Sequence, residues 1–129
     1  MAWDLANAKE VWGIKDKQFP IYSGVLATGG DLVFYGTMEG WFRAVDAHTG
    51  AILWEFKTGS GIVADPMTFK GPDGRQYIAI YSGIGGWMGA AAFSSVSLDD
   101  EYAALGITGA MKGIKKVTGP GDTLYVFGL

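Results

Sequence analysis

The sequence contains no cysteine, only one histidine and few charged residues. Without cysteine the chain has no disulfide, no thiolate nucleophile and no zinc–thiolate site, and one histidine without companions makes no metal site. Acidic residues number 13 and basic residues 10, for a formal net charge of −3. A nucleic-acid-binding surface needs clustered positive charge, so we expect no nucleic-acid partner.

Long hydrophobic runs are missing as well. No apolar stretch approaches the ~20 residues that a membrane-spanning helix needs, and the first residues do not form the charged-then-apolar leader of a secreted protein. Glycine, in contrast, accounts for 21 of the 129 residues, and 14% of the residues are aromatic. With 49% hydrophobic residues the chain is too apolar to be disordered. Abundant glycine beside abundant aromatics indicates short strands joined by tight turns.

The most informative stretch of the chain occurs twice. Residues 44–54 read Ala-Val-Asp-Ala-His-Thr-Gly-Ala-Ile-Leu-Trp, which predicts two strands joined by a tight turn at Asp46. Residues 2–12 have the same spacing from aspartate to tryptophan, and Asp4 precedes Asp46 by 42 residues. A catalytic carboxylate is needed once, so we interpret the repeated aspartates as turn residues and the repeated tryptophans as structural.

A second pair of matching positions gives a similar period. Tyr35 lies six residues before Trp41, and Tyr81 lies six residues before Trp87, which is an offset of 46 residues. Four short strands that recur every 42 to 46 residues match the size of a β-propeller blade. The alternative is an isolated antiparallel sandwich, which does not require the repeated spacing.

We therefore predict an all-β chain made of propeller blades. Residues 2–14 would form the tail of one blade, residues 21–57 a complete blade, and residues 62–129 most of a further blade. Residues 88–121 would be an insertion, in which residues 99–114 are predicted to form a short helix with acidic residues at its start and lysines near its end. So few blades cannot close a propeller, and we expect a fragment cut at its N-terminal side.

The repeat motif at residues 44–54 resembles the tryptophan-docking repeat of alcohol dehydrogenases that depend on pyrroloquinoline quinone (PQQ). The resemblance covers essentially the whole chain and is strongest to the C-terminal part of the methanol dehydrogenase large subunit. The segments that carry it are residues 19–24, 26–37, 39–42, 57–62, 72–77, 82–87 and 123–127.

This resemblance implies an eight-bladed propeller that holds PQQ and a Ca²⁺ or lanthanide ion on its axis. It implies a periplasmic enzyme that oxidises a primary alcohol and passes electrons to a c-type cytochrome, with a homodimer as one assembly of the full-length form. In the family, the catalytic aspartate, the metal ligands, the disulfide ring formed by adjacent cysteines and the tryptophan that stacks on the quinone all lie in earlier blades. We therefore expect this chain alone to hold no metal and to be inactive.

The resemblance also places a candidate cofactor site. In the family the backbone of a Gly-Gly-Trp motif approaches the quinone, and this position falls on Gly86 and Trp87. Glycine lets a backbone come close to a flat ligand and present N–H donors to its carboxylates and carbonyls. A second cofactor-facing aromatic, usually tryptophan, corresponds to Tyr22. The alternatives are a plain loop whose tryptophan fills the blade core, and a tyrosine that is simply packed.

Two other classes of function stay open at this point. One is a non-catalytic outer-membrane assembly protein, whose propeller uses related repeats. The other is a self-standing β-rich interaction module that assembles into a ring from several copies. Either would use the repeat as a scaffold without a cofactor.

Overall fold

The computed structural model of the protein describes residues 1–15, 18–93, 96–97 and 99–128. Within these residues the strands form three antiparallel sheets of two, four and three strands. The elements follow in the order β1 (Ala2–Asp4), β2 (Lys9–Trp12), β3 (Val25–Ala27), β4 (Leu32–Gly36), β5 (Trp41–Asp46), β6 (Ile52–Lys57), β7 (Met67–Lys70), β8 (Gln76–Ser82), α1 (Gly86–Phe93), η1 (Ala103–Gly106), α2 (Ile107–Ala110), η2 (Ile114–Lys116) and β9 (Thr123–Gly128).

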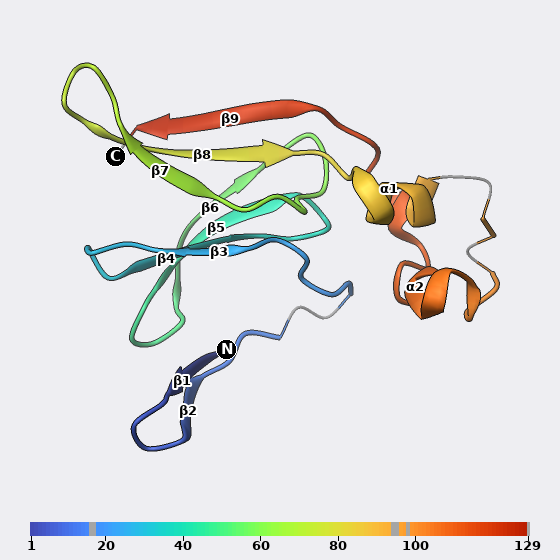
Figure 1. Cartoon of the computed structure of the whole chain (residues 1–129), viewed down its shortest axis with the longest axis horizontal. Helices are drawn as coiled ribbons and strands as arrows, with labels where there is room; N and C mark the ends of the chain where they lie inside the picture. The colour runs from blue at the N-terminus through green and yellow to red at the C-terminus, as the bar shows by residue number, and fades with distance from the viewer. Residues whose placement is uncertain (16–17, 94–95, 98, 129) are drawn as a thin grey trace.

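The two larger sheets are stacked, and the helical segments gather at one end of them (Figure 1). The all-β class with a helical insertion near the C-terminus is therefore confirmed. None of the helices among the described residues has the length and apolar character needed to cross a membrane. The division of the chain into one complete blade and parts of two others stays a prediction.

The four-stranded sheet has the strand order β3-β4-β5-β6, so each strand pairs with its neighbour in sequence. Strand-forming residues separated by short turns produce this meander. In the register, Phe34 lies opposite Ala44, and Ala44 lies opposite Trp54. Because side chains alternate across a strand, these three residues share one face of the sheet.

The main core lies between this face and the sheet of β7, β8 and β9. Ile78 and Ile80 of β8 are fully buried and belong to one cluster with Phe34, Phe42 and Ala44. Burial of these side chains is the largest favourable contribution that holds the two sheets together. The central strand β8 is thereby placed over the four-stranded sheet, and its end determines where the next segment begins.

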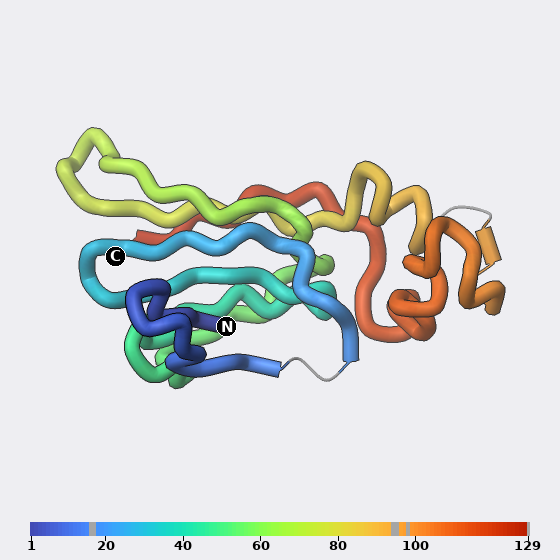
Figure 2. Tube along the Cα trace, turned by 60° about the horizontal axis from the view of Figure 1, so that its bottom comes forward, coloured from blue at the N-terminus to red at the C-terminus, as the bar shows by residue number. Residues whose placement is uncertain are grey.

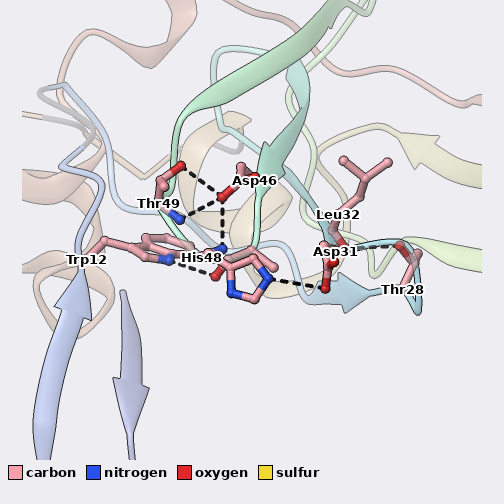
Figure 3. Close-up of polar contacts among 8 residues, drawn as sticks. Trp12, Thr28, Asp31, Leu32, Asp46, His48 and Thr49 are labelled. Carbon is pink, nitrogen blue, oxygen red and sulfur yellow. Dashed lines mark hydrogen bonds and ion pairs between the residues drawn. The ribbon is translucent and has the colours of Figure 1, made fainter.

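The turn at Asp46 is built by side-chain hydrogen bonds (Figure 3). Asp46 Oδ1 accepts from the Thr49 N–H at 2.7 Å, the Thr49 hydroxyl at 2.9 Å and the His48 N–H at 3.0 Å. Asp4 accepts from the N–H groups of Ala6 and Asn7 in the same way. The interpretation of both aspartates as turn residues is confirmed.

The first hairpin docks on this turn, as Figures 2 and 3 show. The indole N–H of Trp12 donates to the Ala47 carbonyl at 2.9 Å. The face of the ring lies against Gly50, where a Cβ would be only 2.7 Å from the ring carbons. The tryptophan of one repeat therefore packs on the aspartate turn of the next, which confirms its structural role. Trp54, its counterpart, packs against Phe127 with the ring centroids 5.1 Å apart.

We expect Asp46→Asn to remove a pH-dependent part of the stability. The Thr49 hydroxyl, followed by the Thr49 and His48 N–H groups, lowers the pKa of Asp46. A carboxyl group whose pKa is lower in the folded state stabilises the fold at pH values above its usual pKa of about 3.9. This stabilisation is lost as the pH falls through the lowered pKa. The thermal midpoint of the variant should therefore lie below that of the parent at neutral pH, and the difference should shrink below about pH 4. A constant difference across this range would contradict the expectation, and Thr49→Val should reproduce part of the loss.

The single helix predicted for residues 99–114 is wrong. The segment forms three short pieces, η1, α2 and the start of η2, because the backbone turns left-handed at Ala104 (φ 48°) and Leu105 (φ 59°). A left-handed residue cannot continue a right-handed helix. Positions 94–95 and 98 of the predicted insertion lie outside the described residues.

Candidate functional site

The candidate cofactor site lies at the end of the stacked sheets where β8 leads into α1. β3 begins at the same end, so the segment with Tyr22 and the segment with Gly86 both reach it (Figure 1). An apolar cluster beneath them joins the two segments and consists of Phe19, Met38, Ile84, Met88, Ala92, Met111 and Ile114. Tertiary packing therefore brings together residues that lie more than sixty positions apart.

The Gly-Gly-Trp segment is exposed, and the residues immediately before and after it are buried. Ile84 and Met88 are buried in the cluster, whereas residues 85–87 are exposed. Trp87 is 59% exposed, so its side chain does not fill a core formed by the described residues. Gly86 has a φ of 57°, a left-handed value that glycine adopts at little cost.

Space next to the two glycines is open. A Cβ placed on Gly85 or Gly86 would meet no atom of a described residue within 4 Å apart from its own chain neighbours. α1 begins here, and the first turn of a helix leaves its N–H groups without intrahelical partners. The arrangement offers an aromatic face, backbone donors and room for a flat ligand.

Tyr22 lies at the same end, 42% exposed. The next residue, Ser23, holds the segment on β4, because its hydroxyl accepts from the Gly36 N–H at 2.8 Å and lies 3.0 Å from the Gly36 carbonyl. The exposed Asp65 packs against Gly24, where a Cβ would be 2.1 Å from its Oδ1. Contact of Tyr22, Gly86 and Trp87 with a cofactor stays a prediction.

Backbone contacts connect these segments across the end of the sheets. Ile62 and Gly83 form a parallel bridge, and the Gly83 N–H donates to the Gly61 carbonyl at 2.9 Å. The Ile62 N–H donates to the Thr37 carbonyl, also at 2.9 Å. The loop at residues 61–62 therefore lies between the end of β4 and the end of β8.

Sequence reasoning did not identify three buried hydroxyl residues beside the site. Thr58, Ser60 and Ser82 are almost fully buried and hydrogen-bond to one another's backbone or side chains. Isolated serines and threonines in glycine-rich segments have no distinctive pattern, and only the pairing of β8 with its neighbours brings Ser82 to the other two. No signal in the sequence could have singled them out.

The described residues contain no group of three or more histidine, cysteine, aspartate or glutamate side chains that could hold a metal ion. What the described residues offer at this site is one surface, called here the wall, with an exposed aromatic ring at Trp87 and backbone N–H donors at the start of α1. Such a wall can bind and orient a flat anionic ligand.

This fold is that of a PQQ-type propeller segment. The family described as glucose/ethanol/alcohol dehydrogenase, beta-propeller domain (PQQ) matches residues 4–78. The match extends over more than half of the chain, and the chain belongs to this family. The family predicted from the repeat motif is therefore confirmed.

Individual relatives point the same way. A lanthanide-dependent methanol dehydrogenase of Methylacidiphilum fumariolicum (strain SolV) is 50% identical over 131 residues, which cover 100% of this chain and 21% of the relative. Subunit 1 of a methanol dehydrogenase [cytochrome c] of Paracoccus denitrificans is 41% identical over 128 residues, covering 99% of this chain and 20% of the relative. The chain thus spans about a fifth of the length of these curated relatives.

A solved structure supports the fold in three dimensions. The europium-containing methanol dehydrogenase superposes with a TM-score of 0.88 at 50% sequence identity, over 98% of this chain and 22% of that chain. The propeller class predicted from the 42- to 46-residue period agrees with this similarity.

Proposed function

We propose that this chain forms part of the cofactor pocket of a PQQ-dependent dehydrogenase that oxidises a primary alcohol, with methanol as the first candidate. The observation that carries the proposal is the exposed segment at residues 85–87, held between buried neighbours in a chain that belongs to the PQQ family. The names of the relatives, all dehydrogenases, favour this function over the non-catalytic scaffold and the ring-forming module.

The residues at this end fit PQQ as a wall. When bound, PQQ supplies the quinone that takes up a hydride from the alcohol. The backbone at Gly86 and Trp87 would donate to the polar edge of PQQ, and the indole of Trp87 would lie beside that edge. Tyr22 would add a second aromatic surface that keeps water from the ring. The described residues do not fit a metal site, and the proposal assigns them no part in holding Ca²⁺ or a lanthanide.

The proposed electron acceptor and metal are based on the names of the relatives. The printed name of the Paracoccus protein contains cytochrome c, which supports a c-type cytochrome as electron acceptor. The printed name of the Methylacidiphilum protein contains lanthanide-dependent, which supports a lanthanide beside PQQ in a complete enzyme. We place the reaction in the periplasm. A homodimer is the assembly to test by light scattering.

The proposal is tested with a hybrid enzyme in which these 129 residues replace the matching part of the europium-containing methanol dehydrogenase. The hybrid should bind PQQ and reduce an acceptor dye with methanol. Trp87→Ala should weaken PQQ binding about tenfold, since loss of an aromatic contact with a flat ligand costs on the order of 1 kcal/mol or more. The dissociation constant is measured by titration of the metal-loaded, PQQ-free hybrid.

A matched control uses another exposed tryptophan. Trp3 is half exposed on β1, in the first hairpin, and Trp3→Ala should leave the dissociation constant within about twofold. Equal effects of the two substitutions, or a hybrid that folds without binding PQQ, would argue against the proposed pocket.

We also expect the 129-residue chain by itself to be inactive. Acid–base and metal chemistry both require several groups that converge on one atom. The assay is dye reduction with methanol, PQQ and Ca²⁺ or La³⁺. Turnover by the purified chain alone would refute this expectation.

A further inference from the structure

A small buried junction of hydroxyl groups lies at the end of β8, three residues before the exposed Gly-Gly-Trp segment. Thr58 and Ser60 come from the loop after β6, and Ser82 is the last residue of β8. Ser82 is 1% exposed, and the other two are also buried. Burial of a hydroxyl without a hydrogen bond costs free energy of folding. The backbone at this junction is therefore held where these hydrogen bonds can form.

The hydroxyls form a connected network of hydrogen bonds. The Ser60 N–H donates to Ser82 Oγ at 3.2 Å, Ser82 Oγ lies 2.9 Å from Thr58 Oγ1, and Thr58 Oγ1 lies 2.9 Å from the Gly40 carbonyl. Each hydroxyl has one proton to donate and can accept from another group. The Ser60 carbonyl also lies 2.7 Å from Thr58 Oγ1 and 2.9 Å from Ser82 Oγ, so each hydroxyl has two neighbours that can accept its proton. The network connects β8 to the turn between β4 and β5.

A second set of bonds connects the same loop to the end of the helical insertion. The Gly61 N–H donates to Thr118 Oγ1 at 2.7 Å, and the Ser60 hydroxyl donates to the Gly119 carbonyl. The backbones approach so closely that a Cβ on Gly83 would be 2.1 Å from the Gly121 carbonyl oxygen. The residue after Ser82 therefore has no freedom to shift toward this segment.

The junction ends where the exposed segment begins. Ser82, Gly83 and Ile84 are buried, and residues 85–87 are exposed immediately after them. Residues 85–87 can therefore take their position from the buried residues on either side. Binding sites depend on such support, because a displacement of about 1 Å weakens contacts with a rigid ligand.

We propose that Ser82 is a positioning residue for the cofactor wall. By hydrogen-bonding to Thr58 and Ser60, its hydroxyl fixes the end of β8 and thereby the position of Gly86 and Trp87 relative to bound PQQ. This inference rests on the proposed function, since it names what holds the same site. Ser82 does not contact the cofactor. Its effect passes along the backbone from the end of β8 to the start of α1.

The test uses Ser82→Ala in the hybrid enzyme and measures PQQ affinity, the absorption spectrum of bound PQQ and hydrogen exchange at residues 85–88 of the PQQ-free form. We expect a dissociation constant about tenfold higher, because a broken buried network leaves unsatisfied partners. We also expect a shifted cofactor spectrum and faster exchange. Thr68→Ala is the control, since Thr68 also donates to a backbone carbonyl, at Tyr77, but on the exposed hairpin. Its effect on affinity should stay within about twofold.

A matched pair at Thr58 separates positioning from plain stability. Thr58→Val keeps the shape and removes the hydroxyl, and it should weaken PQQ binding as Ser82→Ala does, with less than additive loss in the double variant. Thr58→Ser keeps the hydroxyl and should retain affinity. If Ser82→Ala does not fold, the comparison of Thr58→Val with Thr58→Ser tests whether the hydroxyl network positions the cofactor wall.

Two results would overturn the inference, and they differ from failure of the proposed function. In the first, the hydroxyl-deleting variants lose thermal stability but bind PQQ as the unsubstituted hybrid does. In the second, exchange at residues 85–88 is unchanged in the PQQ-free variants. If the unsubstituted hybrid folds but does not bind PQQ, the proposed function fails, and the assignment of Ser82 to that cofactor fails with it.

Discussion

Phe42→Ala is expected to lower the free energy of unfolding by about 3–5 kcal/mol, the usual cost of deleting a fully buried aromatic side chain. Phe42 is 0% exposed and lies where the two larger sheets meet. Its ring centroid is 5.9 Å from that of Phe34 on its own sheet and 5.7 Å from that of Phe127 on the other. Deletion leaves a cavity that neither sheet can fill without moving.

Phe69 gives the matched comparison for this substitution. It is 44% exposed on the edge strand β7 and stacks on Tyr77 with the ring centroids 5.5 Å apart. Phe69→Ala should cost about 1 kcal/mol, close to the value of one aromatic pair. Both are measured from urea unfolding of the hybrid enzyme, followed by tryptophan fluorescence. Similar losses at the two positions would show that the core does not lie between the sheets.

Gly83→Ala is expected to have the second largest effect, at or above about 3 kcal/mol of unfolding free energy, the upper end of what overpacking costs. The new Cβ would lie 2.1 Å from the carbonyl oxygen of Gly121 and 2.9 Å from its carbonyl carbon. A side chain could rotate out of the way, but a backbone carbonyl moves only together with its chain segment. The Gly83 N–H donates to the Gly61 carbonyl, which holds the Gly83 side of the contact in place.

Gly85→Ala, two residues further on, is the control. A Cβ at Gly85 would meet open space among the described residues, so the stability should change by no more than about 0.5 kcal/mol. Thermal unfolding of the PQQ-free hybrid distinguishes the two variants. If Gly83→Ala were as well tolerated as Gly85→Ala, the close approach of the two backbones would be refuted.

The repeat was predictable because the interactions that build it join residues only a few positions apart. An aspartate that accepts hydrogen bonds from residues two and three positions later, followed by a glycine, builds a turn wherever it occurs. The structure shows this turn at Asp46 and at Asp4. The recurrence of Trp12 and Trp54 at one spacing indicated a structural role, and Trp12 donates to the Ala47 carbonyl in that turn.

The helical insertion was not predictable in the same way. Charges at both ends favoured one helix over residues 99–114, but the left-handed backbone at Ala104 and Leu105 breaks it. Propensity is a weak preference that tertiary packing overrides. The apolar cluster that contains Met111 and Ile114 determines where the pieces lie, and its buried residues come from four separate parts of the chain.

The sequence alone determined the strands, the turns, the period and the family of this protein, because each depends on residues a few positions apart or on a motif that recurs. It also located Gly86 and Trp87 as the candidate site through resemblance. Only the tertiary structure decided that Trp87 is exposed among the described residues, and that Ser82 meets Thr58 and Ser60. Those facts depend on how β8 packs against a loop more than twenty residues away, and such long-range contacts leave no pattern in the order of the amino acids.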